Sequence, residues 1–121
     1  MLIVDDEEHL RESIVFDFTR KGFKVLSAEN GHNAYELLLT NTVDLIISDI
    51  RMPGGDGIEL LDRIRLGDLK MPIVILLTGF ADVSEAEMYA KGASKILTKP
   101  FERKELIAAV YESTGAEPPR T

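Results

Sequence analysis

Leu45-Ile46-Ile47-Ser48-Asp49 is an apolar, β-branched run that ends in a carboxylate, and such runs are typical of strands buried on both faces of a parallel sheet. The same pattern opens the chain, where Asp5 and Asp6 follow Leu2-Ile3-Val4. Ligands of open α/β sheets bind beyond the carboxyl ends of the strands, where neighbouring strand ends lie side by side. The sequence therefore predicts an anionic pocket at the carboxyl edge of a parallel sheet.

Apolar runs alternate with amphipathic stretches along the whole chain, which is typical of the α/β class. Five strands are predicted, at about Leu2–Val4, Lys24–Ser27, Val43–Ser48, Ile73–Thr78 and Lys95–Leu97. Each strand precedes a predicted helix with apolar positions at helical spacing. The helices are marked by Leu10, Ile14 and Phe18; by Ala34, Leu37 and Leu38; by Ile58, Leu61 and Ile64; by Ala86, Tyr89 and Ala90; and by Leu106, Ile107 and Val110. Ser84 is expected to N-cap the fourth helix, and Gly22 and Gly92 to end the first and fourth.

The chain length of 121 residues fits one domain with a single core. Periodicity is lost after residue 114, and Pro118-Pro119 favours an extended chain, so residues 1–114 are predicted as the domain and 115–121 as a linker. The chain contains no cysteine, which excludes a disulfide framework and a thiolate zinc site. A cytoplasmic location is therefore expected.

The formal net charge of -7 argues against direct binding of nucleic acid, because such binding depends on Lys and Arg neutralising phosphates. No apolar stretch reaches the roughly 18 residues that a membrane-spanning helix needs. The expected partners are therefore proteins, and no membrane association is predicted.

Polar residues at the predicted strand ends form one candidate site: Asp5, Asp6, Asp49, Thr78 and Lys99. Carboxylate oxygens suit Mg²⁺, a hard cation that usually keeps several waters and therefore leaves positions for phosphate oxygens. A carboxylate such as Asp49 is also a nucleophile towards phosphorus, and it would form an acyl phosphate. The ammonium of Lys99 and the hydroxyl of Thr78 could bind the phosphoryl oxygens.

Each of these residues alone has an ordinary structural explanation. An Asp after a strand is usually a turn former or a helix N-cap, and a Lys before Pro is usually a solvated loop cation. Only their occurrence together favours a site. The glycine-rich loop at residues 52–57 lacks the lysine of a phosphate-binding loop, and His9 and His32 lack metal-ligand spacing, so surface roles are predicted for both histidines.

The chain resembles the receiver domains of bacterial two-component response regulators over almost its whole length. The resemblance rests on four motifs: Ile3-Val4-Asp5-Asp6-Glu7, Asp49-Ile50-Arg51-Met52-Pro53 with Asp56-Gly57, Thr78-Gly79, and Lys99-Pro100-Phe101. It implies a flavodoxin-like, doubly wound (βα)5 fold with a five-stranded parallel sheet in the order 2-1-3-4-5. That order is the family's, and it is a standard example of a doubly wound sheet.

The resemblance also implies a function, which is a phosphorylation-dependent switch in two-component signalling or a phosphorelay and not a turnover enzyme. Asp49 would accept a phosphoryl group from a sensor histidine kinase or a phosphotransfer protein. Asp6, Asp49 and the backbone carbonyl of Arg51 would ligate Mg²⁺, and Asp5 would assist through water. Thr78 and Lys99 would contact the phosphoryl group, with a cis bond between Lys99 and Pro100. Phosphorylation would change the surface of the fourth helix, fifth strand and fifth helix, through which a homodimer could form.

One position departs from the family pattern, and two others are expected to flank the site. Ile96 stands where an aromatic residue often acts as a rotamer switch, so the signal is expected to pass through the loop at residues 79–81 and the fourth helix. Arg51 and Phe80 lie two residues beyond site residues. They are expected to flank the pocket mouth and to alter the lifetime of the phosphoryl group.

Three other functions remain open on the sequence. An aspartate-nucleophile phosphatase would need a general acid two residues after the nucleophile, where this chain has Arg51. A flavodoxin-like electron carrier would need a Thr/Ser-rich phosphate loop and flanking aromatic residues. A degenerate receiver would bind partners without phosphorylation, although all five site residues are intact here.

Overall fold

The computed structural model describes residues 1–52, 54, 56–67, 70–79 and 84–115. Five parallel strands form one sheet in the order β2-β1-β3-β4-β5, as predicted. The strands are β1 (Leu2–Val4), β2 (Leu26–Ala28), β3 (Leu45–Asp49), β4 (Ile73–Thr78) and β5 (Lys95–Thr98). The sequence order 2-1-3-4-5 makes β1 and β3 neighbours, and this pairing brings the two acidic strand ends together.

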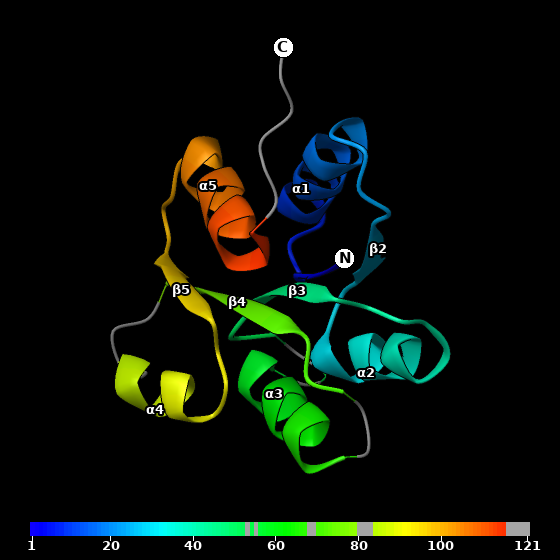
Figure 1. Cartoon of the computed structure of the whole chain (residues 1–121), viewed down its shortest axis with the longest axis vertical. Helices are drawn as coiled ribbons and strands as arrows, with labels where there is room; N and C mark the ends of the chain where they lie inside the picture. The colour runs from blue at the N-terminus through cyan, green and yellow to red at the C-terminus, as the bar shows by residue number, and fades with distance from the viewer. Residues whose placement is uncertain (53, 55, 68–69, 80–83, 116–121) are drawn as a thin grey trace.

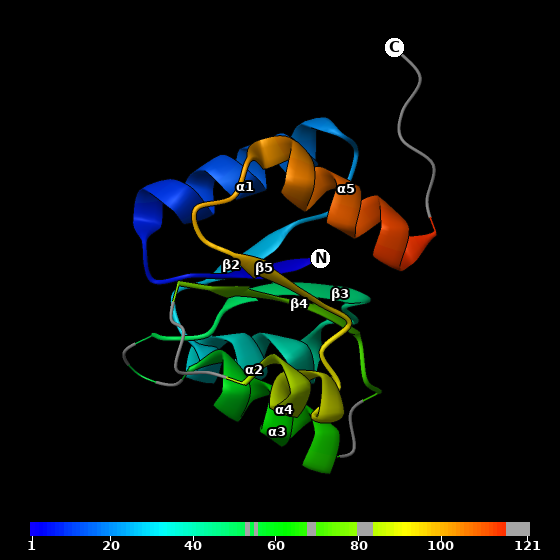
Figure 2. The same ribbon diagram turned by 90° about the vertical axis from the view of Figure 1, so that its left-hand side faces the viewer.

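Helices cover both faces of the sheet (Figures 1 and 2). They are α1 (Glu8–Arg20), α2 (Gly31–Thr40), α3 (Gly57–Leu66), α4 (Glu85–Ala90) and α5 (Arg103–Thr114). Helices α1 and α5 pack on one face, and α2, α3 and α4 pack on the other. The result is a three-layer α/β fold of the doubly wound type.

Side chains that alternate along the strands build two cores, one on each face of the sheet. On the α1 and α5 face, Ile3, Ile47 and Ile75 pack with Phe18 and Val110. The intervening strand residues face the other core, which is made by Leu2, Val4, Ile46, Val74 and Leu76 together with α2, α3 and α4. A strand that is buried on both faces needs a continuous apolar run, and this explains why the strands are so apolar.

Strands β1 and β4 have the predicted bounds, whereas the ends of β2, β3 and β5 differ from the predicted ones by one or two residues. Strand β1 has three residues, and each of them pairs with one residue of β2, from Leu2 with Leu26 to Val4 with Ala28. Lys24 therefore lies outside the ladder, and its carbonyl oxygen accepts a 2.6 Å hydrogen bond from the Met1 amino group. The register of a neighbouring strand sets this boundary, so local composition could not predict it.

The predicted helix signals are present. The Ser84 hydroxyl caps α4 by accepting a hydrogen bond from the Glu87 backbone N–H at 3.3 Å. Gly22 and Gly92, which follow α1 and α4, have φ angles of 94° and 109°, which side chains rarely adopt. Gly115 ends α5 in a left-handed conformation, and the rest of the predicted linker lies outside the described residues.

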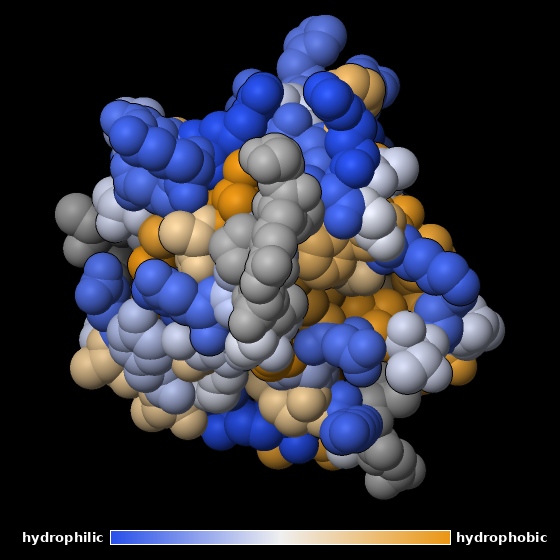
Figure 3. All heavy atoms as spheres, turned by 45° about the horizontal axis from the view of Figure 1, so that its top comes forward, coloured by the Kyte–Doolittle hydropathy of each residue, from blue (hydrophilic) through white to orange (hydrophobic). Residues whose placement is uncertain are grey.

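Hydrophilic residues cover much of the face shown in Figure 3 and surround a hydrophobic area. Among the described residues, the large hydrophobic side chains that are exposed are Phe16, Leu39, Leu66 and Tyr89. None of the helices in the described part of the chain has the length and apolar character to cross a membrane.

Candidate functional site

Three carboxylates meet at the carboxyl edge of the sheet, as the sequence predicted. Asp5 follows β1, Asp6 is next to it, and Asp49 is the last residue of β3. One oxygen of each carboxylate lies within 4.8 Å of the other two. The pairing of Val4 with Ser48 in the adjacent strands β1 and β3 brings the following Asp5 and Asp49 side by side.

The three carboxylates differ sharply in exposure. Asp5 is completely buried and Asp49 is 7% exposed, whereas Asp6 is exposed to solvent. The Asp5 Oδ1 atom accepts a 2.8 Å hydrogen bond from the Glu7 backbone N–H. Its Oδ2 atom is buried and has no hydrogen-bond partner among the described residues. Burial, reinforced by the charges of Asp49 and Asp6, raises the pKa of Asp5 despite the Glu7 N–H and Lys99.

Lys99 supplies the positive charge of the site. Its Nζ atom donates a 3.1 Å hydrogen bond to Asp49 Oδ2 and forms an ion pair with Asp5 Oδ2 at 3.5 Å. The Lys99 backbone N–H donates to the Thr78 carbonyl oxygen at 2.6 Å, and the bond to Pro100 is cis, as the resemblance implied. This backbone contact continues the β4–β5 ladder by one residue and positions the side chain.

Burial lowers the pKa of Lys99, but the hydrogen bond to Asp49 and the charges of Asp5 and Asp49 outweigh it, so the pKa is raised. A cationic group with a raised folded-state pKa stabilises the fold below its unfolded-state pKa. The stabilisation is lost only as the pH rises through the raised value. Lys99 is therefore charged at neutral pH, where it partly neutralises the carboxylates.

Both oxygens of the Asp49 carboxylate have hydrogen-bond partners. Its Oδ1 atom accepts a hydrogen bond from the Ile50 N–H at 2.9 Å, and the Ile50 side chain is buried. Its Oδ2 atom faces Lys99. The chain then turns back, because the Gly57 N–H donates to the Ile50 carbonyl oxygen at 2.8 Å. The candidate nucleophile is therefore on a rigid strand end.

Thr78 ends β4 and is 5% exposed, one residue beyond Leu77, which pairs with Asp49. Its position at the same sheet edge agrees with the prediction. Arg51 is exposed two residues after Asp49, and its role as a carbonyl ligand stays a prediction. Phe80 and most of the loop at residues 79–81 lie outside the described residues. Ile96 is partly buried against the α2–α4 core.

The histidines are on the surface, as predicted. His9 is exposed, and His32 Nε2 lies 3.3 Å from Glu36 Oε1 on the exposed side of α2. Neither residue belongs to the carboxylate cluster.

Two further residues shape the site in ways that the sequence did not predict, although Gly57 belongs to one of the quoted motifs. A Cβ atom at Gly57 would collide with the Asp49 carbonyl oxygen, so only glycine lets α3 begin this close to the nucleophile. The Arg11 Nη1 atom donates a 2.7 Å hydrogen bond to the Asp5 carbonyl oxygen. The start of α3 at Gly57 could have been predicted from the Asp56-Gly57 pair, since Asp56 caps α3 by accepting a hydrogen bond from the Glu59 N–H. The contact of Arg11 with the Asp5 carbonyl oxygen has no signature in the nearby sequence.

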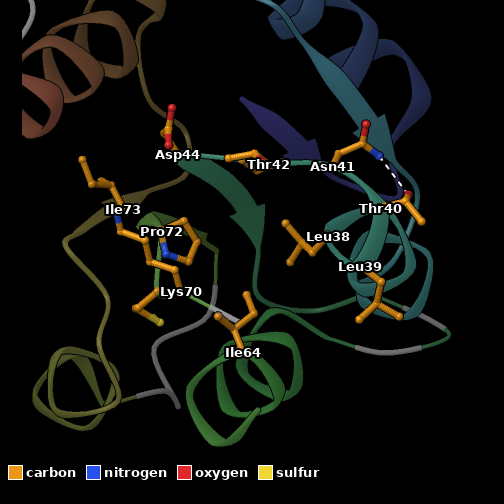
Figure 4. A pocket seen from close by; sticks show the side chains of 12 residues that line it. Leu38, Leu39, Thr40, Asn41, Thr42, Asp44, Ile64, Lys70, Pro72 and Ile73 are labelled. Carbon is orange, nitrogen blue, oxygen red and sulfur yellow. Dashed lines mark hydrogen bonds between the residues drawn. The ribbon is translucent and has the colours of Figure 1, made fainter. Parts of the chain in front are cut away.

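A separate cavity of about 610 Å³ lies at the opposite, amino-terminal edge of β3 and β4. Figure 4 shows its lining side chains, which come from the end of α2, from α3 and from the segments that precede the two strands. The lining is formed by residues 38–44, Ile64 and residues 70–73. The cavity contains none of the predicted site residues.

The site has the donor set of a magnesium site. Its oxygens are hard ligands, and the buried Oδ2 atom of Asp5 accepts no hydrogen bond among the described residues and has only a long ion pair with Lys99, at 3.5 Å. The cluster contains three carboxylates, and Lys99 forms ion pairs with two of them, so a second positive charge would relieve their repulsion. The residues therefore fit a divalent cation.

Asp5→Asn is expected to stabilise the fold by about 1–3 kcal/mol in metal-free buffer, because it removes a buried charge with an unsatisfied oxygen. An acid with a raised folded-state pKa weakens the fold increasingly as the pH rises. The gain should therefore be full near neutral pH and shrink on acidification. Urea unfolding with a chelator present measures it. A variant less stable than the native chain at neutral pH would contradict this reading of Asp5.

Comparison with known proteins places these features in a family. A family model described as "Response regulator receiver domain" matches residues 1–111. The phosphate regulon transcriptional regulatory protein PhoB of Pseudomonas aeruginosa is 36% identical over 120 residues, which cover 95% of this chain. The chain spans only 52% of the length of that relative.

Two solved structures have the same fold. The receiver domain of Francisella response regulator 1452 is 32% identical, with a TM-score of 0.82 and with 96% of this chain and 97% of that chain covered. The receiver domain of the sensor histidine kinase PA1611 from Pseudomonas aeruginosa is 26% identical, with a TM-score of 0.82 and coverage of 95% and 96%. That second structure has a magnesium ion coordinated in its active site cleft.

Proposed function

The chain belongs to the response regulator receiver domain family, and from this premise we propose that it is a signalling switch controlled by phosphorylation of Asp49. One observation carries the proposal: the Asp49 carboxylate lies within hydrogen-bonding distance of Lys99 and beside two further carboxylates, at a rigid strand end. A nucleophile and a cation for the incoming phosphate oxygens are thus held together before any partner arrives.

The proposed step is transfer from a phosphohistidine of a sensor histidine kinase or a phosphotransfer protein. An Asp49 oxygen attacks phosphorus, the phosphorus–nitrogen bond breaks, and the imidazole nitrogen keeps the electron pair and takes up a proton. The product is an acyl phosphate on Asp49. Lys99 exchanges its contact with the carboxylate for one with the phosphoryl oxygens, and the Thr78 hydroxyl donates to them.

Asp5, Asp6, Asp49 and the Arg51 carbonyl are the groups that would hold Mg²⁺. When bound, the cation supplies positive charge for the phosphoryl oxygens. Asp6 is exposed, which keeps its side of the site open to solvent and to a phosphodonor, whereas the buried Asp5 would act from the interior side of the site.

The proposed output is a change in the surface of α4, β5 and α5, which could serve a homodimer or another protein partner. Lys99 directly follows β5, and Lys95 in β5 is joined to Glu112 in α5 by a 2.7 Å ion pair. A shift of Lys99 towards a phosphoryl group would thus act on the strand that contacts α5. The phosphoryl group biases the equilibrium by its differential contacts in the two states.

We propose no turnover of small substrates. An aspartate-nucleophile phosphatase needs a proton donor for its leaving group, and the position two residues after Asp49 is Arg51, which is not a residue type that serves as a general acid. An assay with free phosphomonoesters separates the two functions, because steady release of phosphate would favour the phosphatase.

The function is tested by incubating the chain with acetyl phosphate, with Mg²⁺ or with a chelator, and recording intact masses. We expect one phosphoryl group per chain in the presence of Mg²⁺ and almost none in the chelator. An unmodified chain under both conditions, combined with no uptake from a phosphorylated histidine kinase, would refute the proposal. Phosphorylation that is equally fast in the chelator would refute the part assigned to the metal.

A further inference from the structure

The loop that carries Asp5 and Asp6 is braced by a side chain from the helix that follows it. Arg11, in α1, donates from Nη1 to the Asp5 carbonyl oxygen at 2.7 Å. This carbonyl belongs to the peptide group that joins Asp5 to Asp6. The Arg11 backbone N–H also donates to the Glu7 carbonyl oxygen at 2.9 Å. Arg11 therefore ties the peptide between the two aspartates to the first turn of α1.

The neighbours of Asp6 are fixed by other contacts. The Asp5 N–H donates to the Ala28 carbonyl oxygen at 3.2 Å, and the Glu7 N–H donates to the Asp5 carboxylate at 2.8 Å. The Asp6 side chain is exposed, and it accepts no hydrogen bond from any residue in the part of the chain that the structure describes. The direction of its carboxylate therefore depends on how the Asp5–Asp6 peptide is oriented.

We propose that Arg11 is a positioning residue for divalent-cation binding, acting through the Asp5 carbonyl to aim Asp6 at the pocket shared with Asp49. The inference rests on the proposed function, because it concerns the same metal site. Rotation of the Asp5–Asp6 peptide would swing the Asp6 carboxylate away from the other two, which now lie within 4.8 Å of it. Groups that orient metal ligands in this way typically change metal affinity 10–100-fold when removed.

Charge alone predicts the opposite effect. Arg11 brings a positive charge close to the acidic loop, and this charge repels an incoming cation. Loss of the charge without loss of positioning would therefore tighten Mg²⁺ binding slightly, and at an exposed site salt screens such an effect. The sign of the change in affinity thus separates a positioning role from a purely electrostatic one.

The surroundings of Arg11 indicate that truncation of its side chain would disturb the metal site and not the rest of the fold. Arg11 also lines a hollow of about 430 Å³ with Glu29, Asn33 and Glu36, between α1, the end of β2 and α2. Truncation of its side chain would admit water to the Asp5 carbonyl and would leave no closed void in the core. Alanine also has a high helix propensity, so α1 should persist. We therefore expect an effect at the lower end of the range, about tenfold.

The test compares the native chain with Arg11→Ala, Arg11→Lys and Arg20→Ala by calorimetric titration with Mg²⁺. Arg20→Ala removes the same charge from an exposed position of the same helix, where the guanidinium lies over the Phe16 ring. We expect about tenfold weaker binding for Arg11→Ala, recovery of most of that loss in Arg11→Lys, which keeps a donor and the charge, and native affinity for Arg20→Ala. The rate of phosphorylation by acetyl phosphate should fall in Arg11→Ala at limiting Mg²⁺ and approach the native rate at saturating Mg²⁺.

Native or tighter Mg²⁺ affinity in Arg11→Ala would overturn the inference, as would a rate deficit that saturating Mg²⁺ leaves unchanged. An equal loss in Arg20→Ala would overturn it too, because truncation of an arginine without the contact to the Asp5 carbonyl would then weaken binding as much. Failure of the native chain to bind Mg²⁺ would instead refute the part that the proposed function assigns to the metal, so the two failures are distinguishable.

Discussion

Asp49→Asn is expected to abolish uptake of a phosphoryl group from acetyl phosphate and from a phosphorylated histidine kinase. The amide has the shape of the carboxylate but lacks a nucleophilic oxygen, so no acyl phosphate can form. It can still accept the hydrogen bond from the Ile50 N–H through its Oδ1 atom, so the strand end should keep its structure. Intact-mass spectrometry after incubation with Mg²⁺ and acetyl phosphate measures the loss.

Asp44→Asn is the matched control for this change. Asp44 directly precedes β3, so it lies at the opposite edge of the sheet from Asp49, and it is exposed. The control removes the same charge by the same chemistry, and it should be phosphorylated at the native rate. Phosphorylation of Asp49→Asn at the native rate would show that another residue is the acceptor.

Lys99→Met is expected to slow phosphorylation by about 10²-fold while it strengthens Mg²⁺ binding. The ammonium is the group that would meet the charge developing on the phosphoryl oxygens, and removal of one such donor typically costs 10²–10³-fold in rate. In the resting site the same ammonium occupies Asp49 Oδ2 at 3.1 Å and Asp5 Oδ2 at 3.5 Å. Its removal frees these oxygens for the cation, so the two readouts should move in opposite directions.

Methionine keeps much of the aliphatic stem, so the variant removes mainly the charge. Lys91→Met is the matched control, because Lys91 also forms an ion pair, with Asp62 at 3.0 Å, but outside the site. The control should leave both readouts unchanged. A Lys99→Met variant that is phosphorylated at the native rate, or that binds Mg²⁺ more weakly than the native chain, would contradict the role given to Lys99.

The class of the fold could be predicted because a strand buried on both faces needs a continuous apolar run, and Leu45 to Ile47 and Ile73 to Leu77 are such runs. The strand order could not be derived in this way. It came from the family resemblance, since pairing between distant segments leaves no mark on local periodicity. The start of β2 was misplaced for the same reason, because the register with the short β1 sets it.

The convergence of Asp5, Asp6, Asp49 and Lys99 was predictable, since strand ends in a parallel sheet share an edge. The difference in burial between Asp5 and Asp6 was not predictable. Asp5 and Asp6 look alike in the sequence, but one is fully buried with an unsatisfied oxygen and the other is exposed. Both residues follow the end of β1, and only the packing around this loop decides which of the two side chains is buried.

The contacts of Arg11 and Gly57 could not be predicted, because both residues act on backbone atoms. The Arg11 guanidinium binds a carbonyl oxygen six residues earlier in the chain, and Gly57 makes room for the Asp49 carbonyl oxygen. Every residue has a carbonyl, so such contacts have no residue-type signature. Both residues lie next to the site, but neither contributes a charged ligand to it.

Asp49 is proposed as the residue that takes the phosphoryl group, and this can be tested directly. Borohydride reduction of the chain after phosphorylation in Mg²⁺ converts an aspartyl phosphate to homoserine, and peptide mass spectrometry then locates the converted residue. We expect homoserine at position 49 and at no other position. Conversion at Asp5 or Asp6 with Asp49 intact, or no conversion in a chain that carries a phosphoryl group, would contradict it.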